Sequence, residues 1–269
     1  MSRSLLEPVK ELRVLAAFGS AGLGCAAPAA QEAGLAAAPP VVPPGVSNAS
    51  APAGEAAPST PSAAPSAFTW TADAGVASGT RGAVRLGEPK LEASPHGNAL
   101  CFDGVGDGLI FERNPIAGMS QFTIQVLFRP DAIGSLEAPS EQRFVHFEEG
   151  SATTPESRRV LIETRVVGDQ WFLDTYLRAA GAGKALIDPE KKHPVGRWYW
   201  VALSYGDGTM RHYVDRQLEL EGAVPFEPLG SGRASLGVRL NRVSWFKGCV
   251  RELRVTPAVL PAAELAGSE

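Results

Sequence analysis

Aromatic side chains beside charged ones are the residues of this sequence whose types suit ligand recognition. Trp171 follows a Gly-Asp turn signal, Tyr176 and Arg178 lie nearby, and Tyr199 and Trp245 follow further along the chain. An exposed aromatic ring stacks on the apolar face of a pyranose, while polar neighbours bond its hydroxyl groups. We therefore predict carbohydrate contacts at these residues, with Trp171 as the leading candidate. Rings of this kind also fill cores, and that alternative stays open here.

Carboxylates at a spacing suited to acid–base catalysis are not found. Glu148 and Glu149 are adjacent, so in a strand their side chains point to opposite faces. Glu163 is followed two residues later by Arg165 instead of a second carboxylate. The four histidines show no metal-ligand spacing and are predicted to be turn or surface residues, and no phosphate loop or nucleophile motif occurs. The sequence therefore predicts a protein that is not an enzyme.

One segment offers hard oxygen donors of the kind that calcium prefers. Asp103 and Asp107 flank a glycine-rich turn, and carboxylates are calcium ligands. The same residue types commonly fold such turns through bonds to the backbone. We therefore predict no required cofactor, with calcium at Asp103 and Asp107 as the alternative.

The first 25 residues have the features of an export signal. Residues 14–24 form a short uncharged apolar stretch, which suits the hydrophobic region of a signal peptide better than a membrane span. Cys25 follows at once and resembles the lipidation site of bacterial lipoproteins, although Gly22 stands where that pattern has leucine. We predict lipidation at Cys25. The alternatives are cleavage after residues 27–29 without lipid, or a disordered cytosolic leader.

Residues 26–66 are predicted to be a disordered stalk. Ala and Pro supply 15 and 9 of these positions, and no Lys, Arg or aromatic residue occurs. Such a segment cannot bury enough apolar surface to offset the entropy of ordering it. The whole chain has 25 Lys and Arg against 29 Asp and Glu, which argues against a broad nucleic-acid surface. No uncharged apolar run reaches the ~18 residues of a spanning helix, which excludes a polytopic membrane protein.

From residue 67 to 269 the sequence has the pattern of an all-β domain. Phe122, Ile124, Val126 and Phe128 alternate with mostly polar residues, which predicts a strand with one buried face. Glycine-containing turn signals separate this strand from its neighbours, and a helix is predicted only over 261–266. The pattern favours a two-sheet antiparallel sandwich. The predicted strands are 83–86, 99–102, 109–112, 122–129, 143–148, 159–165, 171–178, 198–205, 210–214, 235–239 and 247–255.

Several of these segments share one family pattern in the same order. Residues 99–104 read Ala-Leu-Cys-Phe-Asp-Gly, residues 122–130 end in Phe-Arg-Pro, and the hairpin 198–215 ends in Tyr-Val-Asp. Together with 246–255 and 259–265, they resemble the concanavalin A-like, laminin-G-like jelly-roll domains. One departure is Arg216, which stands where those domains usually have glycine and puts the geometry of that turn in question.

The resemblance implies a jelly roll in which the first and last long strands lie near each other. Cys101 and Cys249 lie on those two strands, so the resemblance allows a disulfide, with two buried free thiols as the alternative. The resemblance and the absence of catalytic motifs favour a non-catalytic module that binds a glycan or an envelope protein. Together with the N-terminal segment, they predict an exported protein that is held at a membrane only by lipid on Cys25. A periplasmic or secreted form is the alternative location. The alternative functions are a structural or protein-interaction domain, and a divergent glycoside hydrolase or lyase.

Overall fold

The computed structural model describes residues 66–77, 82–133 and 140–268. The predicted signal segment with Cys25, and nearly all of the predicted stalk, lie outside the described residues. Both therefore stay predictions. No helix within the described ranges is long and apolar enough to cross a membrane.

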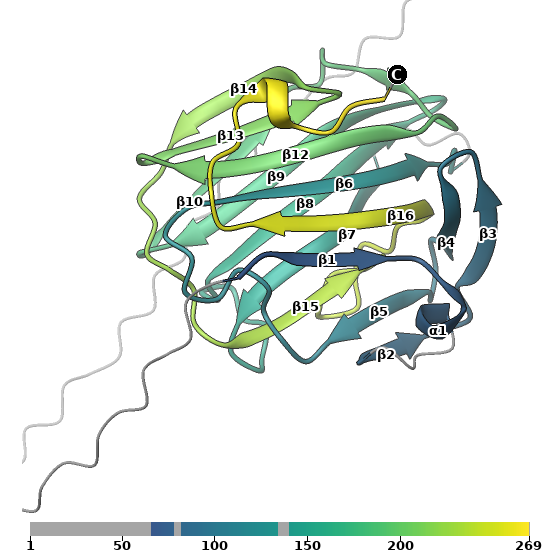
Figure 1. Ribbon diagram of the computed structural model, residues 1–269, viewed down its shortest axis with the longest axis horizontal. Helices are drawn as coiled ribbons and strands as arrows, with labels where there is room; N and C mark the ends of the chain where they lie inside the picture. Colours follow the sequence, from purple (N-terminus) through teal and green to yellow (C-terminus); the bar gives the residue numbers. More distant parts are fainter. Residues whose placement is uncertain (1–65, 78–81, 134–139, 269) are drawn as a thin grey trace, which may run out of the picture. The chain divides into compact units, whose positions relative to one another are not determined.

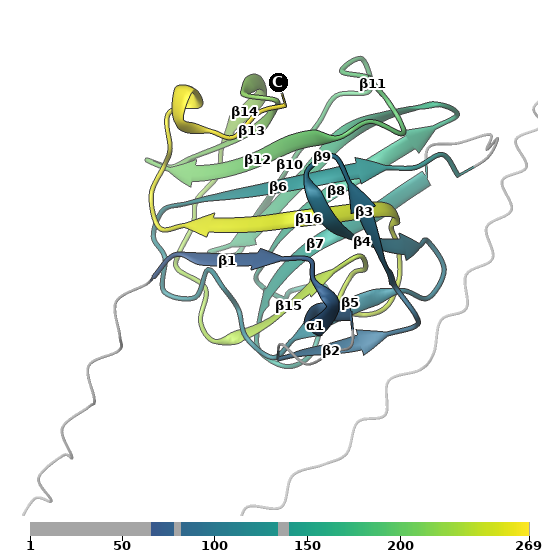
Figure 2. The same cartoon turned by 45° about the vertical axis from the view of Figure 1, so that its right-hand side comes forward.

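Two antiparallel sheets of eight strands each form the domain, which confirms the predicted sandwich (Figures 1 and 2). Sheet A contains β1 (Phe68–Thr71), β3 (Lys90–Ser94), β4 (Gly97–Asp103), β6 (Phe122–Pro130), β12 (Tyr199–Gly206), β13 (Thr209–Val214), β14 (Gln217–Ala223) and β16 (Lys247–Thr256). Sheet B contains β2 (Ala83–Leu86), β5 (Gly108–Phe111), β7 (Ser140–Glu149), β8 (Arg159–Val167), β9 (Gln170–Ala179), β10 (Ala182–Ile187), β11 (His193–Pro194) and β15 (Gly232–Leu236).

The order of strands brings the two ends of the domain together. Sheet A runs β14-β13-β12-β6-β16-β4-β3, with β1 also paired to β16. The last strand therefore lies among the first ones, as Figure 1 shows for the yellow β16 beside the blue β1 and β4. Sheet B runs β10-β9-β8-β7-β15-β5-β2, with β11 paired to β9. Long connections between the sheets make the fold a jelly roll, as the resemblance implied.

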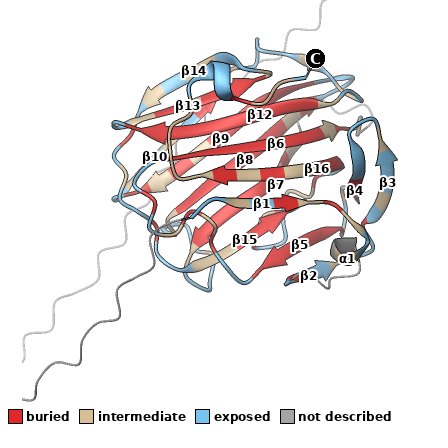
Figure 3. Ribbon diagram, in the orientation of Figure 1, coloured by how far each residue is buried: buried red, intermediate tan, exposed pale blue. Residues whose placement is uncertain are grey.

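The core lies between the inner faces of the two sheets. Phe122, Ile124, Val126 and Phe128 are all fully buried on one side of β6, as the alternation predicted. The ring of Phe128 stacks on Phe144 from sheet B with 4.5 Å between centroids. Figure 3 shows β6 and β12 buried along most of their length.

The other face of β6 is buried as well, because the end of the chain covers it. Thr123 donates through its hydroxyl to the carbonyl of Ala258 at 2.7 Å and accepts from the N–H of Leu260. Gln125 accepts from the N–H of Ala266 at 2.7 Å. The polar residues that alternate along this strand therefore hold the C-terminal segment against sheet A.

The turn at Arg216 adopts the left-handed backbone conformation that favours glycine, although neither Asp215 nor Arg216 is glycine. Asp215 and Arg216 have φ values of 45° and 69°, both in the left-handed region. Two further contacts support this strained conformation: Asp215 accepts from the N–H of Trp200 at 2.9 Å, and Arg216 donates to the carbonyl of Leu265 at 2.7 Å. The departure from the family pattern therefore changes the residue but keeps the tight turn.

Several predicted elements differ from the observed ones. The strand predicted over 235–239 ends at Leu236, because Gly237 turns the chain with a φ of 80°. The helix predicted over 261–266 is a short 3₁₀ turn, η1 (Ala262–Glu264), and the one-turn helix α1 (Ala74–Ala77) was not predicted. The strands that sequence analysis missed, β1, β3, β10, β11 and β14, are mostly exposed or half-buried. They are short or carry few apolar residues, such as Phe68 and Trp70 in β1 or Leu218 and Leu220 in β14.

Candidate functional site

The outer face of sheet B carries a dense group of charged side chains. Along β8 the side chains of Val160 and Ile162 enter the core, while Arg159, Glu163 and Arg165 point away from it. On β9, Asp174 lies opposite Glu163 and Tyr176 lies opposite Leu161, so both share this outer face. The strict alternation of strands thus places charged groups from neighbouring strands on one face.

A pocket of about 310 Å³ opens among these side chains. This volume lies at the lower end of the range for small-molecule sites. Its polar and aromatic lining consists of Arg143, Arg159, Glu163, Arg165, Asp174, Tyr176 and Arg239. Two further pockets border segments outside the described residues, so the pocket on sheet B is the better-defined candidate.

Both carboxylates of the pocket are held by arginines. Arg143 donates to Glu163 at 2.6 Å, and Arg165 donates to one oxygen of Asp174 through two nitrogens, at 2.6 and 2.8 Å. Glu141, at the edge of the group, pairs with both Arg143 and Arg165. The acids and two of the arginines therefore form one network with fixed positions.

Glu163 has an unusual protonation equilibrium for a carboxyl group. It is 3% exposed, and burial raises its pKa to about 7, with Asp174 and Glu141 adding to the rise and Arg143 opposing it. A buried carboxyl next to other acids holds its proton because the charged form loses hydration and meets like charges. Glu163 is therefore a candidate for holding a proton near neutral pH.

Tyr176 gives the pocket an aromatic wall. The guanidinium of Arg159 lies over its ring, 5.3 Å from the centroid. The same guanidinium donates through one terminal nitrogen to the carbonyls of Thr154, Pro155 and Ser157, at 3.3, 3.2 and 2.8 Å. These contacts fix the plane of Arg159 beside the ring.

The loop 237–246 closes one side of the pocket and supplies Arg239. Its backbone is tied to β7: the N–H of Leu240 donates to Nδ1 of His146 at 3.1 Å, and the carbonyl of Ser244 accepts from the N–H of Arg143 at 2.9 Å. The loop is therefore anchored to the same strand that presents Arg143, and Arg239 has a defined position.

Two of the predicted carbohydrate contacts are wrong. Trp171 is 0% exposed and packs edge-on against Phe128 in the core, and Tyr199 is 6% exposed and donates to the carbonyl of Pro194. Their strands turn these rings inward, so neither is accessible for stacking. Tyr176 lines the pocket, whereas Arg178 lies on the same face without lining it.

Sequence analysis missed most of the site. Glu163 and Arg165 were seen only as neighbours along one strand, and the partner carboxylate, Asp174, comes from the next strand. The prediction that every histidine is a turn or surface residue is also wrong, because His146 and His212 are 0% and 1% exposed. The only sequence signal for this site was the alternation of charged residues within adjacent strands. Which of these residues face each other depends on the register of the strands.

The turn at Asp103 and Asp107 uses its carboxylates to bind backbone. One oxygen of Asp103 accepts from the N–H groups of Val105, Gly106 and Asp107, at 2.8 to 3.1 Å. Asp107 accepts from the N–H groups of Glu88 and Asp103. Partial burial raises the pKa of Asp103, but these N–H groups lower it more, to below its usual value. These bonds explain the turn geometry, and calcium at this turn stays an untested alternative to the prediction of no required cofactor.

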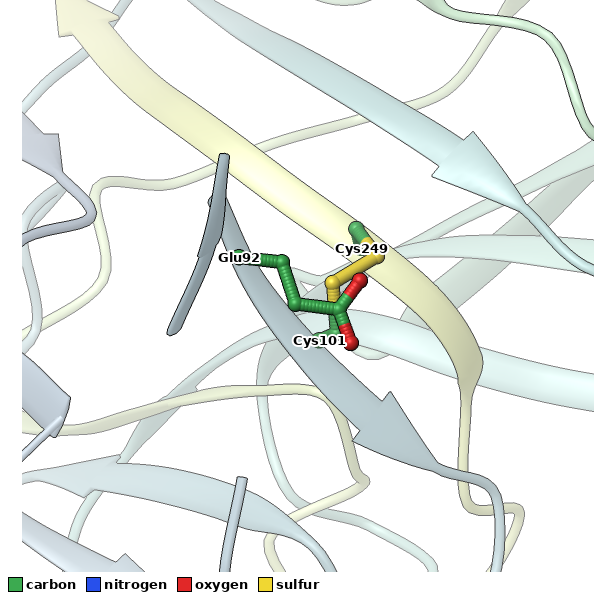
Figure 4. A group of neighbouring side chains, drawn as sticks. All are labelled: Glu92, Cys101 and Cys249. Carbon is green, nitrogen blue, oxygen red and sulfur yellow. A yellow bond between two sulfur atoms is a disulfide. The ribbon is translucent and has the colours of Figure 1, made fainter. Parts of the chain in front are cut away.

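Cys101 and Cys249 form a disulfide between β4 and β16, where the register pairs them directly (Figure 4). The alternative of two free thiols is therefore wrong. In the described part of the chain, Glu92 is the only further residue of a metal-ligating type that groups with these two sulfurs. Sulfurs joined to each other offer no thiolate to a metal, so the three residues make no metal site while the bond is intact. A structural disulfide is typical of proteins in oxidising compartments and fits an exported domain.

The geometry defines the class of this protein as a jelly-roll sandwich with a polar pocket on one open sheet. A family model described as the concanavalin A-like lectin/glucanases superfamily matches residues 103–266. The chain belongs to this superfamily, which confirms the resemblance found in the sequence. A comparison with curated proteins finds no match.

Solved structures with a similar fold include domains of several larger proteins. Domain 4 of AbnA, an extracellular arabinanase from Geobacillus stearothermophilus, is 17% identical, with a TM-score of 0.48 and coverage of 66% of this chain and 79% of that one. The Ruminococcus gnavus sialidase module CBM40 is 16% identical, with a TM-score of 0.42 and coverage of 55% and 80%. The NanB sialidase from Streptococcus pneumoniae is 16% identical, with a TM-score of 0.43.

For the NanB sialidase, the similarity covers 57% of this chain but only 25% of the sialidase chain. All three TM-scores lie below 0.5. A fold of this kind also carries many functions, so function depends on the pocket itself.

Proposed function

We propose that this domain is a non-catalytic module that binds a carbohydrate in the pocket on sheet B. The observation that carries the proposal is the combination of one accessible aromatic ring, Tyr176, with charged groups of fixed position in the same pocket. A pyranose presents an apolar face and a rim of hydroxyl groups. A ring and oriented ionic groups complement these two features.

The position of the pocket on an outer sheet face also favours a role in ligand binding over a role in packing within the domain. On sheet A, the outer side of β6 is covered by the C-terminal segment through Thr123 and Gln125. On sheet B, the equivalent surface of β8 and β9 holds the pocket. A saccharide chain could therefore lie across sheet B without displacing a segment of the domain.

A glycan array probed with the full chain tests the proposal. We expect binding to a defined set of glycans, and we expect Tyr176→Ala to weaken it by about tenfold or more, a loss of about 1.4 kcal/mol. Trp198→Ala removes an aromatic outside the pocket and serves as the matched control. Silence of the whole array, with and without calcium, would remove the carbohydrate proposal and favour a structural or protein-interaction domain.

A second candidate, glycosidic bond cleavage, is favoured by one observation. The pKa of Glu163 is raised to about 7, and a carboxyl that holds its proton near neutral pH can serve as a general acid. Against it, Asp174 is held by Arg165 and Glu163 by Arg143, which leaves no carboxylate free to attack or to activate water. Turnover of a polysaccharide panel that is lost in Glu163→Gln would support the enzyme and refute the non-catalytic proposal.

We also propose that the protein is exported and held at a membrane by lipid on Cys25, with residues 26–66 as a tether. The disulfide supports an oxidising location. Incorporation of labelled palmitate that is lost in Cys25→Ala is the expected result. A mature chain that begins after Cys25, as measured by mass spectrometry, would contradict the lipid anchor.

A further inference from the structure

The four arginines of the pocket are not equally neutralised. Arg143 and Arg165 donate to carboxylates, as described above. In the described part of the chain, Arg159 donates to backbone carbonyls only, and its Nε is buried without a hydrogen-bond partner. Arg239 likewise has a buried Nε without a partner, and within the described ranges its guanidinium forms no ion pair. Two positive groups in this pocket therefore lack a counter-ion among the residues that the structure describes.

Glu148, a further acid beside these arginines, does not form an ion pair with either of them among the described residues. Glu148 is opposite Arg159 in the register of β7 and β8, but it is buried and lies 3.1 Å from Nε2 of His146. Among the residues that the structure describes, neither Arg159 nor Arg239 comes close enough to Glu148 for an ion pair, although its charge acts on both at longer range. The guanidinium of Arg239 loses hydration and faces Arg143 and Arg159, and both effects lower its pKa.

An uncompensated guanidinium is costly inside a protein, because buried donors without acceptors lose their bonds to water. Guanidinium groups match carboxylates and sulfate groups well, because their planar donors form two parallel hydrogen bonds to such anions. The contact of Arg159 with the Tyr176 ring sets this donor plane beside the aromatic wall. The pocket thus joins a surface for a sugar ring to donors for an anion.

We infer that the ligand is an acidic saccharide, whose carboxylate or sulfate group is bound by Arg239 and Arg159 while its ring stacks on Tyr176. This inference rests on the proposed carbohydrate binding and narrows it to one chemical class. Neutral sugars would leave the two arginines without a partner, so they should bind more weakly.

Calorimetric titration of the full chain tests the inference with four probes. These are a galacturonate tetrasaccharide, the same chain as methyl esters, and a galactan tetrasaccharide with and without sulfate esters. We expect at least one acidic probe to bind about tenfold or more tightly than its neutral counterpart, with an affinity that falls as salt rises. Which acidic probe binds distinguishes the carboxylate from the sulfate.

Variants separate failure of the inference from failure of the proposed function. Arg239→Ala should bring the acidic and neutral probes to near parity, and Arg239→Lys should restore only part of the preference, because it keeps the charge but not the paired donors. Arg254→Ala removes one arginine from sheet A and is the matched control. Thermal unfolding of each variant shows that it is folded.

Equal binding of acidic and neutral probes by the unaltered protein would overturn the inference. A preference that persists in folded Arg239→Ala would also overturn it. If Tyr176→Ala still abolishes binding in either case, the carbohydrate site remains and only its acidic specificity is wrong. If no probe binds and the glycan array is silent, the proposed function itself fails.

Discussion

His212 provides a direct test of the packing between the two sheets. Its imidazole lies between them, 1% exposed, with Nδ1 2.9 Å from the hydroxyl of Thr175 on the facing strand β9. Nε2 lies 3.9 Å from a carboxylate oxygen of Glu219. Burial lowers the pKa of His212 from 6.5 to about 4, because the charged imidazolium loses its hydration in the core.

Because burial lowers the pKa of His212, acidification should destabilise the folded protein through this residue. Between pH 6.5 and pH 4 the unfolded chain binds a proton at His212 and the folded chain does not. Protonation therefore favours the unfolded state as the pH falls, and the free energy of unfolding decreases. With about 1.4 kcal/mol for each pH unit between the two pKa values, the loss between pH 7.5 and pH 4.5 is about 2.5 kcal/mol.

Other groups also titrate in this range, so a variant is needed to isolate His212. Burial also lowers the pKa of His146 to about 4, which adds to the loss. Glu163, whose pKa is raised, has the opposite effect: its stabilising contribution is full below about pH 4.5 and is lost as the pH rises through about 7. A comparison of the same protein with and without His212 cancels both of these contributions.

His212→Asn removes the titrating group while its amide keeps a polar atom near Thr175. Urea unfolding at pH 7.5 and pH 4.5 measures the free energy of unfolding of each protein. The unaltered protein should lose about 2.5 kcal/mol more than the variant on acidification. Val214→Ala, on the same inner face of β13, should lose as much as the unaltered protein. A difference below about 0.5 kcal/mol between the unaltered protein and His212→Asn would refute the reasoning.

Two further predictions concern the disulfide and the core. In a Cys25→Ala background, replacing Cys101 and Cys249 by alanine should lower the free energy of unfolding by about 3 to 5 kcal/mol, because the bond joins residues 148 positions apart. Urea unfolding measures this free energy. A change below about 1 kcal/mol would contradict the expected stabilisation. Phe128→Ala should also lower the free energy of unfolding by about 3 to 5 kcal/mol, because a cavity forms beside Phe144 at the centre of the core. Phe128→Leu should lower it less. Equal losses for the two variants would show that the core collapses around either side chain.

The sequence by itself determined the class of fold and the pattern of the central strands. Alternating apolar residues on the strand from Phe122 to Phe128, and turns marked by glycine, are local signals, because side chains alternate with a period of two in any strand. The family pattern added the neighbourhood of Cys101 and Cys249, which the disulfide confirms. Edge strands such as β3 and β14 were not predicted, because each has only a few small or aliphatic side chains alternating with charged ones and buries little of them.

Only the tertiary structure decided which of the candidate residues form a site. Trp171 and Tyr176 occur on one strand, and the parity of their positions sends the first into the core and the second to the outer pocket. Glu163 and Asp174 become neighbours through the register of β8 and β9, and Arg239 joins them through a loop that folds back on β7. Register and loop placement depend on contacts between segments far apart in the chain, so no local pattern specifies them.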